Sequence, residues 1–187
     1  MVSLLVGVPA RYLPAEDTYL LRDALESFAG EACLEIGFGS GAVISSLSQR
    51  FRLAVGTDII GLEDARLARS PQVDLVLSDG ASCFRDGCFD LVFFNPPYLP
   101  SAPPEDRTVD GGLTGIEVPI SFLEEGLRVL RGGGTVIALL SDKGDIRSFI
   151  GRCEGLGLAV EEVARKDLFY EILVVLKMKR DSKRGGR

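Results

Sequence analysis

Histidine is absent from all 187 residues of the chain, and its four cysteines include no Cys-x-x-Cys pair. The first absence excludes Ser-His-Asp and Cys-His catalysis, because both rely on an imidazole as the general base. Together the two absences argue against a zinc site built from this chain alone, so we expect no metal ligands. Chemistry in such a chain must use carboxylates, amides and backbone groups, or a cofactor that is already activated.

Long apolar runs and an excess of positive charge are lacking too. No apolar run in the sequence approaches the ~20 residues of a membrane-spanning helix, and the apolar residues 2–8 lack the basic region and cleavage site of a signal peptide. We therefore expect a cytoplasmic protein that makes no contact with a membrane. The net charge of −6 argues against binding long duplex nucleic acid by counter-ion release.

The length of 187 residues predicts a single domain over 1–187, because a chain of this length is too short to form two separate hydrophobic cores of ordinary size. Residues 1–30 are predicted to form an N-terminal segment and a helix. The basic residues of 180–187 are typical of a frayed tail.

A strand, a glycine-rich turn and a helix follow one another early in the chain. The strand is predicted at 33–36, and the helix has an apolar face that consists of Val43, Ile44, Leu47 and Phe51. Between them lie three glycines, Gly37, Gly39 and Gly41. Glycines permit positive φ and let a ligand approach the backbone closely. This order is typical of the nucleotide-binding unit of a doubly wound α/β fold.

Three predicted strands end in an acidic residue, namely Glu35, Asp58 and Asp79. In an open α/β sheet these ends face one crevice. Glu35 would repel a pyrophosphate and suits the positive charge of S-adenosylmethionine, which favours this cofactor over NAD. Asp58, about 20 residues beyond the glycine turn, has the placement of a carboxylate that binds ribose hydroxyls. Asp79 could accept a hydrogen bond from an adenine amine, although each acid could also be a simple turn residue.

The fourth predicted strand, at 91–94, runs into Asn95-Pro96-Pro97-Tyr98. Two prolines fix two φ angles and favour extended geometry before them, so the Asn95 amide is expected in the same crevice. A carboxamide offers an acceptor oxygen and two donor hydrogens, which suits the planar –NH2 group of an amide or of a base. Tyr98 can cover a flat group there. A plain polyproline turn is the alternative.

The remaining pattern predicts a helix from Pro119, a fifth strand at 135–140, a helix capped by Ser141 or Asp142, and two β segments near 159–164 and 171–178. The segment 99–115 is rich in proline, glycine and acids, including Glu105, Asp106 and Asp110. It is either a loop that faces the substrate or a surface loop.

In this order, the motifs resemble the class I S-adenosylmethionine-dependent methyltransferases. Within that class they resemble the HemK-related protein-glutamine methyltransferases of the archaeal and eukaryotic release-factor branch. The resemblance is carried by residues 14–18, 35–41 and 95–98, with Gly111-Gly112 and 115–117. It implies a Rossmann-like α/β fold, with a seven-stranded, mostly parallel sheet and helices on both faces. The implied reaction methylates the glutamine amide in the Gly-Gly-Gln motif of a class I release factor and yields S-adenosylhomocysteine.

The resemblance also implies a role for each matching residue. The methionine part of the cofactor would contact Thr18, Glu35 and Gly37, within a loop completed by Gly39 and Gly41. The ribose would bind Asp58, and the adenine would bind Asp79 and the backbone of Gly80. Gly80 stands where relatives often carry a larger apolar residue, so we expect a looser adenine wall. The substrate amide would be held by Asn95 and the Pro96 carbonyl, within the turn that Pro97 and Tyr98 complete.

Partners and rival functions follow from the same resemblance. Short members of the family often work with a small zinc-ribbon activator. We expect it to cover the edge of the third strand, 73–78, since an exposed apolar edge needs a cover; a helix of the same chain is the alternative cover. The alternative function is methylation of an adenine amine in DNA or RNA, where Asn-Pro-Pro-Tyr also occurs. Such enzymes usually add a basic groove, and this acidic chain argues against it. A non-enzymatic scaffold is the third possibility.

Overall fold

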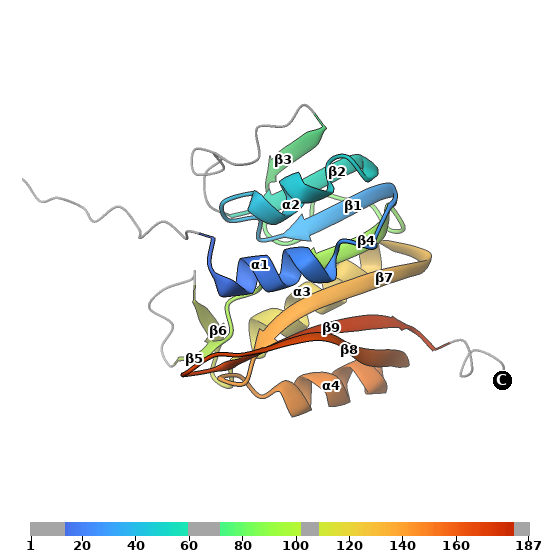
Figure 1. Ribbon diagram of the computed structural model, residues 1–187. Helices are drawn as coiled ribbons and strands as arrows, with labels where there is room; N and C mark the ends of the chain where they lie inside the picture. The colour runs from blue at the N-terminus through green and yellow to red at the C-terminus, as the bar shows by residue number, and fades with distance from the viewer. Residues whose placement is uncertain (1–13, 60–71, 102–108, 182–187) are drawn as a thin grey trace, which may run out of the picture.

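A seven-stranded sheet forms the centre of the molecule (Figure 1). The computed structural model describes residues 14–59, 72–101 and 109–181. From one edge to the other, the strands are β3 (Val73–Leu77), β2 (Phe51–Asp58), β1 (Gly30–Ile36), β4 (Phe89–Phe94), β7 (Leu130–Ser141), β9 (Ile172–Arg180) and β8 (Leu158–Asp167). The first five are parallel, and β9 runs antiparallel to both of its neighbours. The predicted seven-stranded, mostly parallel sheet is confirmed.

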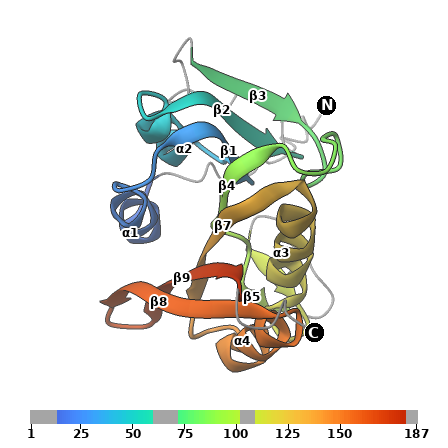
Figure 2. The same cartoon turned by 90° about the vertical axis from the view of Figure 1, so that its right-hand side faces the viewer.

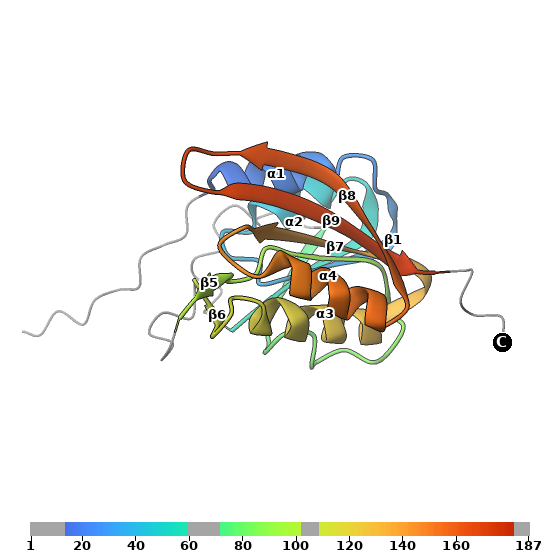
Figure 3. The same cartoon turned by 90° about the horizontal axis from the view of Figure 1, so that it is seen from below.

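Helices cover both faces of this sheet (Figures 2 and 3). One face carries α1 (Glu16–Ala24) and α2 (Ala42–Leu47), and the other carries α3 (Glu117–Val129) and α4 (Ile146–Gly155). Each face therefore has its own apolar core. Strands with both faces covered read as continuous apolar runs, which is why the last four residues of β4 are apolar and all buried.

Three predicted helix boundaries are wrong. Phe51 does not belong to α2, because it pairs with Gly30 at the start of β2, yet its ring joins the same core as the apolar face of α2. Pro119 is the third residue of α3, which begins at Glu117. The N-cap of α4 is Asp145, whose Oδ1 accepts from Ser148 N–H at 3.1 Å.

Two short strands, β5 (Leu99–Pro100) and β6 (Asp110–Gly112), form a small separate pair within the segment predicted as a loop. Glu105 and Asp106 of that segment lie outside the described residues. Arg180, the first residue of the predicted tail, is still part of β9 and pairs with Leu158. Asp181 is described as well, and residues 182–187 of that tail lie outside the described residues.

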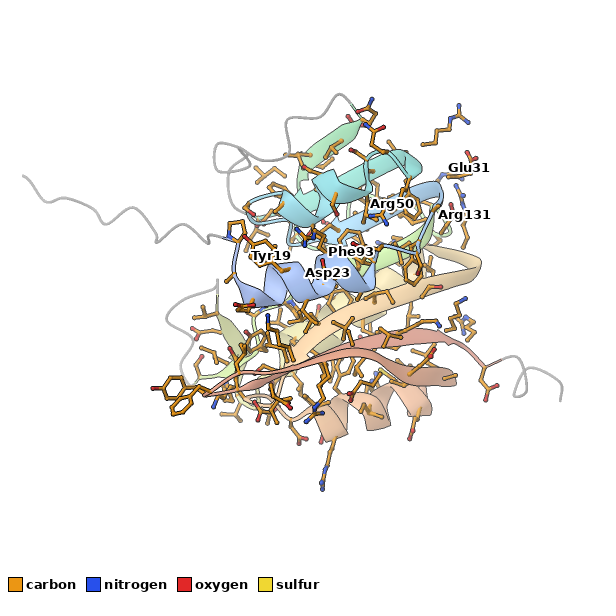
Figure 4. All side chains as sticks on the ribbon, in the orientation of Figure 1. Tyr19, Asp23, Glu31, Arg50, Phe93 and Arg131 are labelled. Atoms are coloured by element: carbon orange, nitrogen blue, oxygen red, sulfur yellow. The ribbon has the colours of Figure 1, made fainter. Side chains whose placement is uncertain are left out.

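The amino ends of the parallel strands are tied together by charge and hydrogen bonds. Asp90 on β4 accepts from the N–H groups of Glu31 and Ala32 on β1, at 2.9 Å each, and from Arg131 on β7 at 2.8 Å. Figure 4 shows Glu31 and Arg131 together at this end of the sheet. The predicted site residues lie at the opposite, carboxyl end. Within the described ranges, no helix is both long and apolar enough to cross a membrane.

Candidate active site

The glycine turn lies over the carboxyl ends of β1 and β2. Gly37, Gly39 and Gly41 have φ angles of 75°, 50° and 74°, a region that residues with a Cβ rarely adopt. Gly37 N–H donates to the Thr57 carbonyl at 2.7 Å, and Gly39 N–H donates to the Asp58 carboxylate at 3.0 Å. The turn therefore brings the predicted glycines together with the acid at the end of β2.

Glu35 lies at the end of β1 beneath this turn, with 3% of its surface exposed. Its Oε2 accepts from Ile44 N–H at 2.9 Å, in the first turn of α2, where the helix dipole favours negative charge. Burial, joined by repulsion from Asp58, nevertheless raises the pKa of Glu35 well above its ordinary value. A cationic ligand would offset both the desolvation and the repulsion.

These residues fit S-adenosylmethionine by the chemistry of their side chains. The buried carboxylate of Glu35 suits a positively charged amino acid part, and the half-buried carboxylate of Asp58 suits a pair of hydroxyl groups. A pyrophosphate would add negative charge to a site in which negative charge is already unfavourable for Glu35. The preference for this cofactor over NAD therefore agrees with the electrostatics of the folded chain.

Asp79 and Gly80 follow β3, next to Asp58. Ser78 N–H donates to the Asp58 carbonyl at 2.9 Å, so the ends of β2 and β3 lie side by side. The Asp79 side chain is exposed, whereas Gly80 is buried with a φ of 54°.

Space beside Gly80 is occupied by Glu125 of α3. The Glu125 carboxylate accepts a hydrogen bond from Ala81 N–H. A Cβ added at residue 80 would lie 2.4 to 2.6 Å from that carboxylate. The side of Gly80 on which a Cβ would lie is therefore filled from α3, by a residue that the sequence pattern did not single out.

Asn95 follows β4, and its amide is held by a residue of α1. Asn95 Nδ2 donates to Oδ2 of Asp17 at 2.8 Å. Asp17 is only 8% exposed, and its Oδ1 accepts from the N–H of Thr18 at 2.7 Å. Because a carboxylate offers only acceptors, Asp17 fixes the NH2 side of the Asn95 amide and turns the oxygen side away from itself. This contact brings Thr18 and Asn95, two predicted site residues, to one place.

Glycines of neighbouring segments pack closely against the Pro97–Tyr98 backbone. A Cβ at Gly111 would lie 2.7 Å from Tyr98 Cα, and one at Gly115 would lie 2.4 Å from the Tyr98 carbonyl oxygen. Gly144 packs at the same place, where a Cβ would lie 3.2 Å from that oxygen. The glycine-rich segment after 110 therefore permits the close approach that holds the Asn95–Tyr98 turn.

The Tyr98 side chain is half-buried beside this turn. Burial raises its pKa far above the usual value, and the carboxylates of Glu171 and Asp17 add to the rise. Its phenol therefore stays protonated and can donate a hydrogen bond, but it cannot act as a base at neutral pH. This agrees with a site that works by binding and positioning.

The sequence analysis predicted no role for two residues of this candidate site, Asp17 and Glu125. Asp17 lies inside the 14–18 motif, which offered a signal, but its partner Asn95 is 78 residues away in the chain. Glu125 lies on a helix whose polar face gave no signal at all. Both contacts depend on packing between elements that are distant in sequence.

The fold is that of a class I methyltransferase, with the glycine turn, Glu35, Asp58 and Asn95 together at the carboxyl end of its sheet. No protein-family model matches the chain. The chain is 33% identical over 185 residues to a Methanocaldococcus jannaschii protein named protein N5-glutamine methyltransferase, and the match covers 90% of this chain and 91% of that protein. It is also 40% identical over 134 residues to mouse methyltransferase HEMK2, which covers 59% of this chain and 62% of the mouse protein.

A solved structure agrees with these relatives. The complex of Mtq2 and Trm112 from E. cuniculi, described as responsible for methylation of the translation termination factor eRF1, superimposes with a TM-score of 0.77. The two chains are 27% identical, and the match covers 91% of this chain and 98% of that one. The chain therefore belongs to the HemK-related family of protein-glutamine methyltransferases. It is a methyltransferase that uses S-adenosylmethionine as its methyl donor, as predicted.

Proposed function

We propose that this methyltransferase modifies the glutamine side-chain amide in the Gly-Gly-Gln motif of a class I peptide-chain release factor. The observation that carries the proposal is the fixed carboxamide of Asn95, whose NH2 side is held by Asp17 at 2.8 Å. The oxygen of the same amide is a hydrogen-bond acceptor, which is the group that the N–H of a substrate amide requires. The eRF1 activity of the E. cuniculi complex, a structural relative, supports the choice of substrate.

Cofactor binding is assigned to the residues around the glycine turn. We assign the methionine part to Thr18, Glu35 and Gly37, the ribose to Asp58, and the adenine to Asp79 with the Gly80 backbone. Gly39 and Gly41 complete the loop. When bound, S-adenosylmethionine supplies a methyl group on a positively charged sulfur that is a good leaving group.

Amide binding is assigned to the Asn95–Tyr98 turn. An amide nitrogen is a poor nucleophile because its lone pair is delocalised into the carbonyl. Asn95 Oδ1 and the Pro96 carbonyl would accept hydrogen bonds from its two N–H groups and fix its direction of approach. Positioning and electrostatic complementarity of this kind lower the barrier without a side-chain base. Tyr98, which stays protonated, would pack beside the amide, and Pro97 would keep the turn rigid.

Methyl transfer from labelled S-adenosylmethionine to a purified release factor tests this proposal. Parallel reactions contain a factor whose motif glutamine is replaced by alanine, and bulk DNA and RNA. We expect label on the unmodified factor and none on the alanine form. Label on nucleic acid alone would overturn the proposal and favour the adenine alternative.

The proposed partner is a small zinc-ribbon activator at the β3 edge. β3 lies at one edge of the sheet, and Leu77 on this strand is 61% exposed. A related chain, Mtq2, was solved in complex with Trm112. Co-purification of the two proteins, and its loss in Leu77→Asp, would support this interface. Unchanged co-purification of that variant would place the activator elsewhere.

A single domain is proposed for 1–187, in the cytoplasm, where release factors act. The support for one domain is that the described ranges 14–59, 72–101 and 109–181 all contribute strands or helices to the seven-stranded sheet and its two flanking cores. Limited proteolysis tests it: a stable fragment that lacks either β3 or β9 would divide the chain into two units.

A further inference from the structure

The hairpin that joins β8 to β9 ends in two exposed aromatic side chains. Phe169 is 89% exposed and Tyr170 is 79% exposed. Their rings contact each other edge to face, with centroids 4.6 Å apart and planes at 86°. Adjacent large apolar side chains at such exposure often mark interaction sites, since aromatic residues gain much from burial.

This hairpin tip lies at the same end of the sheet as the candidate active site. Ser141 ends β7 and pairs with Leu173, so the turn between β8 and β9 lies at the carboxyl ends of the parallel strands. Figures 1 and 3 show the turn projecting at the end where β5, β6 and the start of α1 also lie. Glu171 of the turn is close enough to Tyr98 to raise its pKa, after the larger effect of burial.

The tip is held in place from both sides. Leu168 N–H donates to the Glu171 carbonyl at 2.8 Å and closes the turn. Ser141 Oγ donates to the Glu171 carboxylate at 2.8 Å, and Lys166 pairs with Glu16 at the start of α1. A surface that is already ordered loses less conformational entropy when a partner binds. These contacts therefore hold the turn that carries the two rings in one conformation before a partner binds.

Other exposed apolar side chains lie on or beside the short strand pair β5–β6, at the same end of the sheet. Leu113 is 70% exposed, Val109 39% and Leu99 38%, and all three belong to β5, β6 or the residues beside them. A site that recognises only a carboxamide would accept any exposed glutamine. Selectivity for one protein therefore needs contacts outside the amide-binding turn.

We propose that the Phe169–Tyr170 tip docks the part of the protein substrate that flanks its target glutamine. The inference rests on the proposed function, since it needs a protein that delivers a glutamine to the same edge. Aromatic rings pack well on exposed peptide backbone and apolar side chains and often dominate the affinity of an interface.

Stacking on a nucleic acid base is the competing use of two exposed rings. The charges around the tip argue against it. Lys166 pairs with Glu16 and Arg165 pairs with Asp167, while Glu171 accepts from Ser141 Oγ, and the chain has a net charge of −6. These described residues supply no excess of positive charge for the phosphates that accompany a stacked base, whereas docking of a protein surface needs none.

The test compares wild type with Phe169→Ala/Tyr170→Ala, with the activator present in every reaction. We expect KM for the release factor to rise about tenfold or more, with kcat within twofold of wild type. Fluorescence anisotropy with a labelled factor should show the same loss of affinity. Calorimetry should show unchanged binding of S-adenosylmethionine, which confirms that the variant is folded and its cofactor site intact.

The matched control is Leu53→Ala. Leu53 is a 40% exposed apolar side chain near the amino end of β2, at the opposite end of the sheet, and its loss should leave KM unchanged. Wild-type activity with an unchanged KM and Kd in the double variant would overturn the inference alone. Absence of transfer by wild type would overturn the proposed function and the inference with it. A loss of affinity for a labelled RNA oligonucleotide, with none for the factor, would assign the tip to nucleic acid.

Discussion

Asp17→Asn is the substitution that tests most directly how Asn95 is oriented. The Asp17 carboxylate accepts from Thr18 N–H at 2.7 Å through Oδ1 and from Asn95 Nδ2 at 2.8 Å through Oδ2. An asparagine keeps the shape but has one acceptor and one NH2 group. If its oxygen stays with Thr18, its NH2 group faces the NH2 group of Asn95. Asn95 must then rotate by half a turn and present NH2 to the substrate in place of oxygen.

The size of the effect follows from the hydrogen bonds involved. Hydrogen bonds to a charged group contribute about 1.5–3 kcal/mol, and Asp17 is only 8% exposed, so solvent replaces them poorly. A rotated Asn95 would oppose the N–H groups of the substrate amide, whose nitrogen gains positive charge in the transition state, and would lose a hydrogen bond of this charged kind there. A loss of about 1.5–3 kcal/mol corresponds to roughly a 13- to 160-fold decrease in kcat.

Steady-state kinetics and calorimetry measure the two expected outcomes separately. We expect kcat for the release factor to fall by that factor while the Kd for S-adenosylmethionine stays within about threefold, since Asp17 acts on Asn95. Asp23→Asn is the matched control on the same helix. Asp23 pairs with Arg22 at 2.7 Å on the exposed side of α1 (Figure 4), and kcat should not change.

Two results would refute this account of Asp17. A kcat close to wild type in Asp17→Asn would show that the orientation of Asn95 does not depend on this carboxylate. An equal loss of kcat and cofactor affinity, together with a lower melting temperature, would show that Asp17 supports the fold and not the amide.

Three further predictions concern the amide, the turn behind it and the buried acid. Asn95→Ala should lower kcat about 100-fold or more with cofactor binding nearly intact by calorimetry; equal loss of both would make Asn95 structural. Gly115→Ala should lower the melting temperature, because Gly115 has a φ of 78° and its Cβ would lie 2.4 Å from the Tyr98 carbonyl, whereas Gly151→Ala on α4 meets nothing within 4 Å and should not. Glu35→Gln should raise the free energy of unfolding at neutral pH by about 0.5–2 kcal/mol and weaken cofactor binding about tenfold. Since the folded protein raises the pKa of Glu35, wild-type stability should fall as pH rises from the unfolded pKa through the folded one, and urea unfolding of Glu35→Gln should lack that slope.

Much of the fold could be predicted because its signals are local. The buried strand 91–94, the glycines of the turn and the acids after the strands all show in short stretches of sequence. Rules for parallel sheets then place the ends of these strands at one edge, and the structure does place Asn95, Glu35 and Asp58 there. The strand, glycine turn and helix were enough to predict a doubly wound α/β fold, and the resemblance to class I methyltransferases implied the seven-stranded sheet.

The wrong and missing predictions share a physical cause, which is packing between elements that are distant in sequence. Phe51 continues the apolar face of a helix by its spacing, yet it reaches the same core from β2. Periodicity reports which side chains are buried and not which element carries them. Likewise, the spacing of residues does not show that Glu125 of α3 reaches Ala81, 44 residues away, or that the turn after Asp167 projects beside Tyr98.

The acidic residues at the two ends of the sheet have different partners, and this difference bears on the choice of ligand. At the amino end, Asp90 pairs with Arg131 at 2.8 Å, and Glu31 lies 3.5 Å from Arg52. At the carboxyl end, Glu35 accepts from a backbone N–H and Asp17 from the Asn95 amide, and burial together with repulsion from Asp58 makes negative charge at Glu35 unfavourable. A cationic cofactor would offset this charge, whereas a phosphate would add to it. The same feature that favours S-adenosylmethionine at Glu35 thus favours a protein amide over a nucleic acid base at Asn95.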